Sequence, residues 1–327
     1  MMRLFPMKNH PQSRSRSKGF TLAELLVAMA VTLILVMLTL TITGTAMDSW
    51  RAARTEIRAA GQAKFMLNAL GRDLESMVSR LGNNRSQWLV ATTNQAQLGP
   101  RSAPSPNASR LVFFTTAADR YDGNAGSMDQ PSGANNANAN NGATDLGGDI
   151  SAVSYELDFA EPIFGAQNPV FSTFVLYRNL MEPNVTYNSQ VLGAVNLEQA
   201  FNNQAGPNDL TDLVCENVYD FTVTFVVTYR GIDGFPRTTR LPVMSTAGGD
   251  RVLRSFAITG SGLEPDQRPG SEFSGGRIAA VELSITVLSD QGIEIMKRTP
   301  TFRGPEKAQF LEKHSYRYSR SVRIPQS

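Results

Sequence analysis

The residue types that most often carry enzyme chemistry are scarce in this sequence. It contains one cysteine, Cys215, and two histidines, His10 and His314. A single cysteine excludes an intrachain disulfide and a cluster of zinc thiolates, and His314 is the one histidine outside the basic N-terminal segment. A Ser–His–Asp triad would have to use His314, but no Gly-x-Ser-x-Gly turn is present. We therefore expect no enzyme activity, no cofactor and no metal centre, with Cys215 in the core and His314 at the surface.

Two glycine-containing stretches suggest ligand loops at first sight. The stretch "DRYDGNAGSMD" (119–129) has aspartates at 119, 122 and 129, whereas an EF-hand needs alternating acids, a glycine at its sixth position and a glutamate at its twelfth. The stretch "GSGLEPDQRPGSEFSGG" (260–276) lacks the lysine and the strand–helix context of a phosphate loop. We interpret both stretches as surface loops.

Glu24 is the residue whose position says most about function. In "KGFTLAELLVAMAVTLILVMLTLTI" (18–42) this carboxylate lies near the start of an apolar run, and residues 25–47 contain no charge. A helix over these 23 residues would be about 34 Å long, enough to cross a bilayer core of about 30 Å. An ionised carboxylate in lipid costs on the order of several kcal/mol unless it is paired, and the run offers no obvious partner.

The segment before the apolar run is basic. Residues 1–19 contain five cations and no acid, so the rest of the chain has 26 basic and 29 acidic residues. Positive charge before an apolar helix keeps the N-terminus in the cytoplasm and directs the following domain across the membrane. The slightly acidic remainder gives no electrostatic support for binding nucleic acid.

Gly19, Phe20 and Glu24 together favour a processed leader over two alternatives. A plain membrane anchor explains none of these residues, and "TGTAMD" (43–48) is a poor cleavage site for an ordinary secretory signal. The stretch "KGFTLAELLVAMAV" resembles the N-terminal signature of type IV prepilins and pseudopilins. It has a basic leader ending in Gly19, an aromatic first mature residue, Phe20, and a glutamate, Glu24, as the fifth. The resemblance is short but specific, because each feature falls at the required spacing.

This resemblance implies that a prepilin peptidase cuts between Gly19 and Phe20 and methylates the new N-terminus. It also implies a partner for Glu24, which in this family is thought to meet the N-terminal amine of a neighbouring subunit, here the amine of Phe20. Glu24 would then set the register of assembly, as buried polar residues do in coiled coils. The alternative is that Glu24 extends to the membrane interface and has no partner.

The sequence after the apolar run predicts that the helix continues. No proline occurs between Pro11 and Pro100, and apolar or small residues recur every three or four positions. This stripe consists of Trp50, Ala53, Ile57, Ala60, Ala63, Leu67, Leu70, Leu74, Met77 and Leu81. Charged residues such as Asp73 are expected off the stripe. We expect one helix over 22–81, ended by the Gly-Asn-Asn at 82–84, or two helices broken near Gly44.

After residue 88 the pattern changes to one typical of strands. Strands are predicted at 110–116, 150–159, 173–180, 218–230, 251–258, 277–288 and 292–298. A turn in "VLSDQGIEI" is expected to join the last two as a hairpin. A short helix is predicted at 305–314. We interpret the basic stretch "YRYSRSVR" (316–323) as a charged edge strand rather than a contact for DNA.

These elements predict four successive regions. Residues 1–19 form a basic leader, 20–47 a transmembrane or filament-core helix, 48–82 an amphipathic stem helix, and 83–327 an exported β-rich domain. The Gly/Asn-rich segment 123–149 has almost no apolar content and is expected to be a disordered loop. The predicted fold class is α+β, with a long N-terminal helix packed on an antiparallel β-sheet, as in pilins.

The stretch "LNALGRDLESM" (67–77) and the two long strands at 218–230 and 277–288 extend the resemblance to the larger minor pseudopilins. These include the J-type component of type II secretion and the PilW-like pilins, while the Gly/Asn loop and the chain length are similar to Verru_Chthon cassette protein C.

The wider resemblance implies an assembly subunit of a type II secretion or type IV pilus-like filament. Its implied partners are other pilin or pseudopilin subunits and the prepilin peptidase. Such a subunit would be anchored in the bacterial inner membrane with its domain exported, and a bulky domain would suit the filament tip. A pilus-borne module for adhesion or DNA binding is the alternative.

Overall fold

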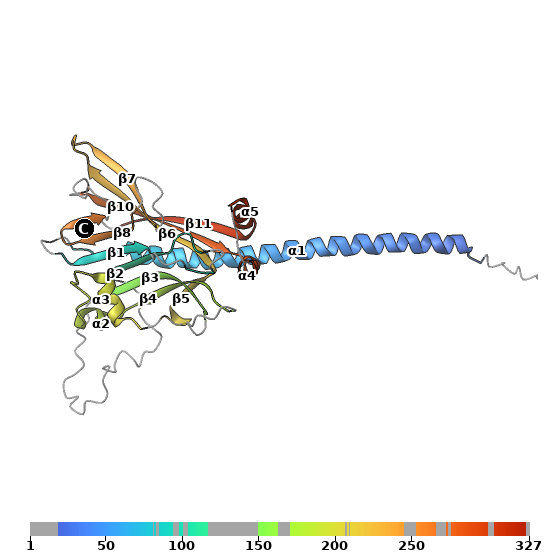
Figure 1. Cartoon of the computed structure of the whole chain (residues 1–327), viewed down its shortest axis with the longest axis horizontal. Coiled ribbons are helices and arrows are strands. Elements are labelled where there is room, and N and C mark those ends of the chain that lie inside the picture. Colours follow the sequence, from blue (N-terminus) through green and yellow to red (C-terminus); the bar gives the residue numbers. More distant parts are fainter. Residues whose placement is uncertain are drawn as a thin grey trace, which may run out of the picture. The chain divides into compact units, whose positions relative to one another are not determined.

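The structure, a computed structural model, contains one long helix, two β-sheets and several short helices (Figure 1). The residues that it describes are 19–80, 82, 85–93, 98–100, 104–116, 150–162, 171–206, 208, 210–244, 253–265, 273, 276–299 and 304–324. The chain divides into two compact units, one that ends at Arg54 and one that begins at Thr55. Every strand that is described belongs to the second unit. The fold class is therefore α+β, as predicted.

Helix α1 runs from Leu22 to Glu75 without interruption. The alternative of two helices broken near Gly44 is therefore wrong. The helix also ends earlier than the predicted end at residue 81. The chain turns after the helix and forms an isolated bridge between Met77 and Thr115, so backbone pairing with a strand replaces the helical hydrogen bonds there. The apolar period continues through Met77 and does not reveal this turn.

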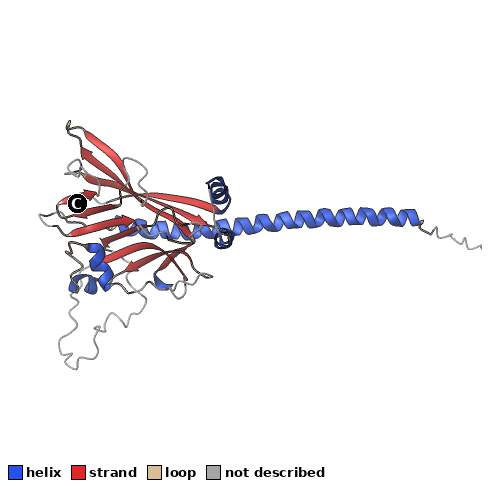
Figure 2. Ribbon diagram, viewed as in Figure 1, coloured by secondary structure: helices blue, strands red, loops and turns tan. Residues whose placement is uncertain are grey.

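The larger sheet has seven strands in the order β5-β4-β3-β2-β1-β8-β9, each antiparallel to its neighbours. Figure 2 shows the strands in red and the helices in blue. The strands are β1 (Gln87–Thr93), β2 (Ser109–Thr115), β3 (Ser151–Ala160), β4 (Thr173–Leu180), β5 (Leu213–Glu216), β8 (Ser255–Thr259) and β9 (Gly262–Pro265). The predictions of β2, β3 and β4 are confirmed, and β8 begins later than predicted. The prediction missed β1 and the two four-residue strands, β5 and β9, which are too short to show a period.

The smaller sheet has four antiparallel strands in the order β11-β10-β6-β7. They are β6 (Val218–Arg230), β7 (Pro236–Val243), β10 (Arg277–Leu288) and β11 (Ser315–Arg323). The predictions of β6 and β10 are confirmed, and β11 is the expected edge strand. The sequence analysis missed β7 because Pro236 and Pro242 argue against a strand. Both prolines are tolerated because β7 lies at the other edge of the sheet.

The short helices are α2 (Pro183–Asn188), α3 (Leu197–Gln204), α4 (Asp290–Arg298) and α5 (Gly304–His314), with a 3₁₀ turn at Leu210–Asp212. Helix α5 confirms the predicted helix at 305–314. Helices α2 and α3 cover the outer face of the large sheet, where Leu197 and Phe201 pack with Val112 and Phe114 of β2. Strand β2 is therefore buried on both faces.

The predicted strand at 292–298, and with it the predicted hairpin, is wrong because these residues lie in α4. The Ser289 hydroxyl accepts a hydrogen bond from the Gly292 N–H at 3.0 Å and caps this helix. Ile293 and Met296 are buried at a helical spacing of three. The apparent hairpin turn is thus the first turn of a helix.

One hydrophobic cluster joins the second half of α1 to both sheets. Its members include Met66, Leu70 and Leu74 of α1, Phe113, Tyr155 and Phe256 of the large sheet, and Phe225 and Val281 of the small sheet. The rings of Phe225 and Phe256 stack with their centroids 4.1 Å apart. The stripe predicted for the stem helix is therefore a core surface from Ala63 to Leu74, whereas its earlier members Trp50 and Ile57 are exposed.

A charged residue, Asp73, also lies in this core. Its carboxylate accepts hydrogen bonds from Arg178 Nε on β4 at 2.8 Å and Nη2 at 3.1 Å, and from the Tyr155 hydroxyl on β3 at 2.7 Å. Burial, followed by the charge of Asp73, raises the pKa of Tyr155 well above its usual value, so the phenol remains a donor. Asp73 lies off the predicted apolar stripe, as expected, but it is buried because β3 and β4 cover this side of α1 as well.

The small sheet contacts α1 through Arg320 of β11. Its Nη1 donates to the Leu67 carbonyl at 3.2 Å and to Asn68 Oδ1 at 2.7 Å, and its Nη2 pairs with Glu75 Oε1 at 3.2 Å. The guanidinium lies directly over Gly71. Polar contacts from both sheets therefore hold the last turns of α1.

Removing one member of the buried pair tests this arrangement. Asp73→Ala leaves the largely buried Arg178 side chain without this carboxylate, and we expect the free energy of unfolding to fall by about 3–5 kcal/mol. Chemical denaturation of the full chain in detergent measures this change. The control is Glu294→Ala, because Glu294 pairs with Arg298 at the exposed surface, where such a pair contributes about 1 kcal/mol or less. Equal unfolding midpoints for the two variants would contradict the proposed role of Asp73.

Candidate functional site

The start of α1 contains the three residues that the sequence analysis singled out. Gly19 and Phe20 precede the helix, and the Phe20 side chain is 89% exposed. Glu24 lies in the first turn of the helix and is also exposed. The peptide bond between Gly19 and Phe20 is thus outside regular secondary structure.

Glu24 forms reciprocal hydrogen bonds with Thr21. The Glu24 Oε2 accepts from the Thr21 N–H at 2.9 Å and from the Thr21 hydroxyl at 3.0 Å, and the Glu24 N–H donates to the Thr21 hydroxyl oxygen at 3.3 Å. This arrangement is a capping box, which satisfies backbone groups at the start of a helix. The sequence analysis missed Thr21, although a threonine followed three residues later by a glutamate before an apolar run is the known signature.

The capping box gives Glu24 a local role without neutralising its charge. All three hydrogen bonds are made to Thr21, which is neutral. An ionised carboxylate at membrane depth remains costly unless a cation approaches it. Helix capping and pairing with a second subunit are therefore compatible roles for Glu24.

The apolar run that follows has exposed side chains. Leu33 and Met37, for example, are 64% and 72% exposed. Among the described residues, α1 is the one helix long and apolar enough to cross a membrane. The hydroxyls of Thr32, Thr39 and Thr41 donate to carbonyls one turn earlier at 2.8–2.9 Å, so these polar groups are satisfied without water. This part of α1 suits lipid or the apolar surface of another helix.

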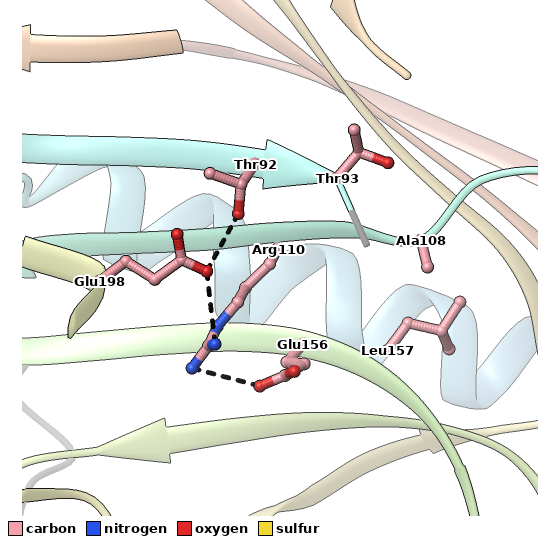
Figure 3. A pocket seen from close by; sticks show the side chains of 7 residues that line it. All are labelled: Thr92, Thr93, Ala108, Arg110, Glu156, Leu157 and Glu198. Atoms are coloured by element: carbon pink, nitrogen blue, oxygen red, sulfur yellow. Dashed lines mark hydrogen bonds and ion pairs between the residues drawn. The ribbon is translucent and has the colours of Figure 1, made fainter. Parts of the chain in front are cut away.

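A polar cavity of about 330 Å³ lies on the large sheet beside α3 (Figure 3). It is lined by Thr92, Thr93, Ala108, Arg110, Glu156, Leu157 and Glu198. Figure 3 shows Arg110 between the two glutamates, with nitrogen–oxygen distances of 3.3 Å to Glu156 and 3.4 Å to Glu198. The Thr92 hydroxyl donates to Glu198 at 3.2 Å.

These contacts explain the cavity as part of the fold. Arg110 on β2 joins β3 to α3, so the network attaches α3 to the sheet. Burial raises the pKa of Glu156 above its usual value, and the charge of Arg110 opposes this shift. The lining contains no histidine or cysteine that could act as a base or nucleophile. Within the described residues, no group of three or more His, Cys, Asp or Glu is placed to hold a metal ion.

Cys215 and His314 are both buried. Cys215 is the predicted core residue, and burial raises the pKa of its thiol to about 12, which keeps it protonated at neutral pH. The expectation that His314 is a surface residue is wrong, because it is only 7% exposed. The end of α5 folds against the start of α4, where the Ser289 N–H donates to the His314 carbonyl at 2.8 Å. The His314 ring lies against Phe310, and its Nδ1 is 3.4 Å from the Ser289 hydroxyl.

Cations of the C-terminal strand make contacts within the domain. Arg317 Nε donates to the Ser284 hydroxyl at 3.3 Å, and Arg320 is bound to α1. These contacts favour a structural role for β11.

Several predicted features lie outside the described residues. They are most of the basic leader (1–18), the stretch 119–129 and the Gly/Asn-rich segment 123–149. The stretch 260–276 is described in part, and the interpretation of it as a loop throughout is wrong because residues 262–265 form β9.

The N-terminal segment matches a known family model. The model is described as the prokaryotic N-terminal methylation motif, and it matches residues 14–40. The matched range contains Gly19, Phe20, Thr21 and Glu24 together with the first turns of α1. Comparisons with curated proteins and with solved structures gave no match. The likeness to known proteins is thus carried by the segment that contains the capping box and the exposed apolar helix.

Proposed function

On the premise that the chain is a type IV pilin-like protein with a prepilin-type N-terminus, we propose that it is a minor pseudopilin. It would act as a non-enzymatic assembly subunit of a type II secretion or type IV pilus-like filament. The observation that supports this most directly is an exposed apolar helix, matched by the methylation motif, with a carboxylate in its first turn. A pilin-type motif indicates a structural subunit that a peptidase processes and that assembles with other subunits.

The same segment supports a location in the bacterial inner membrane. The apolar part of α1 is long enough to cross it, and the five cations in residues 1–19 favour a cytoplasmic N-terminus. The β-rich unit from Thr55 onward would then be exported, either in the periplasm or as part of a filament.

Processing between Gly19 and Phe20 is the first consequence of this proposal. We expect the mature protein to begin with N-methylated Phe20, because the bond is exposed and follows a basic leader. Intact mass and N-terminal sequencing of protein purified from membranes measure this directly. A mature chain that begins near Asp48 would instead indicate an ordinary secretory signal.

Glu24 would then pair with the amine of Phe20 in a neighbouring subunit. The carboxylate is costly in lipid, and its bonds to neutral Thr21 leave its charge uncompensated. An approaching ammonium group supplies that charge at one axial position. The pairing therefore sets how far one subunit is displaced from the next along the filament.

Two variants separate the charge of Glu24 from its helix cap. Glu24→Gln removes the charge, but glutamine also fits a capping box, so we expect an intact helix and at least about tenfold less incorporation into filaments. Thr21→Ala weakens the cap and keeps the charge, and we expect near-normal incorporation. The measurement is the amount of each variant in sheared filaments relative to the membrane fraction. Normal incorporation of Glu24→Gln would refute charge pairing, whereas a matching loss in Thr21→Ala would identify capping as the main role.

A position near the filament tip is proposed on steric grounds. The second unit surrounds the end of α1 with two sheets, and so bulky a domain is difficult to repeat at every position of a thin fibre. We expect gold-labelled antibodies against this unit to mark one end of purified filaments. Label spaced evenly along the fibres would contradict this position.

A further inference from the structure

The turn between β6 and β7 presents two apolar side chains to solvent. Ile232 is fully exposed and Phe235 is 70% exposed. The turn itself is built by hydrogen bonds: the Gly231 N–H donates to the Phe235 carbonyl at 2.9 Å, and the Gly234 N–H donates to the Gly231 carbonyl at 2.8 Å. Asp233 accepts a further bond from the Phe235 N–H at 3.3 Å. The apolar residues are therefore held outward by an ordered turn.

Arginines surround this apolar tip. Arg230 and Arg237 lie on the two sides of the hairpin, and Arg277 is opposite Thr228 on the neighbouring strand; all three arginines are exposed. Residues 228–238 contain one acid, Asp233, which pairs with Arg237 at 2.6 Å. The tip thus combines an apolar end with an excess of positive charge at its base.

The tip and the first residues of the β-rich unit lie at opposite ends of that unit. The Asn217 carbonyl, just before β6, accepts from the Leu288 N–H at 2.8 Å, and α4 follows Leu288. Arg58 of α1 pairs with Asp290 of α4 at 3.2 Å. The tip is at the other end of the 13-residue strand β6, about 40 Å away at 3.3 Å per residue.

We propose that this tip binds the surface of an anionic lipid bilayer. Ile232 and Phe235 would insert among the acyl chains near the headgroups, and Arg230 and Arg277 would contact lipid phosphates. Two side chains can bury far less surface than the roughly 800 Å² per partner of a typical protein interface, whereas insertion into a bilayer requires no complementary pocket. Addition of a partner strand is disfavoured because the free edge of β7 contains Pro236 and Pro242. This inference goes beyond the proposed role in filament assembly.

The test uses the full chain embedded in phosphatidylcholine nanodiscs, so that its apolar helix is already inserted in a bilayer and cannot bind the added vesicles. Separate vesicles of equal parts phosphatidylcholine and phosphatidylglycerol are added, and the nanodiscs that float with them are quantified. We expect Ile232→Asp combined with Phe235→Asp to reduce flotation by about tenfold or more, because burial of one large apolar side chain changes an equilibrium constant by that order. The control is Val195→Asp, which changes a residue 65% exposed elsewhere in the unit.

The outcomes separate lipid from protein as the partner. Flotation that the double variant loses and the control keeps supports the proposal, with thermal melting used to verify that both variants are folded. Absence of flotation for the unaltered chain, or equal flotation of the double variant, overturns it. Equal capture by vesicles of phosphatidylcholine alone overturns recognition of anionic headgroups. Without vesicle capture, crosslinking from a photoreactive side chain at position 232 to another filament subunit would identify a protein contact instead.

Discussion

The buried pair of Asp73 and Arg178 restricts how α1 can pack in the domain. A carboxylate without such partners would be strongly unfavourable in a hydrophobic core, so α1 must present Asp73 to β3 and β4. An apolar stripe alone tolerates small rotations and shifts, because one leucine can replace another in a contact. The ion pair removes that freedom. Arg320 adds a second constraint from the small sheet, and the two sheets are thereby built around one orientation of the helix.

The two parts of α1 differ in how their side chains pack. From Thr55 onward the helix has one core surface and relies on Asp73 for its orientation. The preceding apolar run has exposed hydrophobic side chains and internally bonded threonines, so its surface gives little preference for one neighbour over another. The charge of Glu24 can supply that preference. If Glu24 pairs as proposed, a polar group would set position in both parts, where apolar contacts are permissive.

Local patterns predicted much of this fold. The long helix and strands β6 and β10 have clear periods of their own, so the sequence alone located them. Strand β7 was missed because its edge position makes prolines acceptable, and α4 was mistaken for a hairpin because its capping sequence resembles a turn. The burial of Asp73 and the Arg110 network depend on residues far apart in the chain. No local period could reveal them.

At the N-terminus, in contrast, the sequence was more informative than the structure. The resemblance to the prepilin signature singled out Gly19, Phe20 and Glu24, and the family model covers the same segment. The sequence also contains the local capping pattern of Thr21 and Glu24, in which the partner of the carboxylate is neutral. In the structure Glu24 is therefore not an isolated carboxylate, because its bonds to Thr21 hold it in a defined geometry.

The contact between Arg320 and α1 depends on the absence of a side chain at Gly71. A β-carbon at this position would lie 2.5 Å from Cζ of Arg320. One added methyl group would therefore displace the guanidinium from the helix surface and weaken its hold on the carbonyl of Leu67. The edge strand β11 would then lose its direct attachment to α1, although every residue making that attachment would be unchanged.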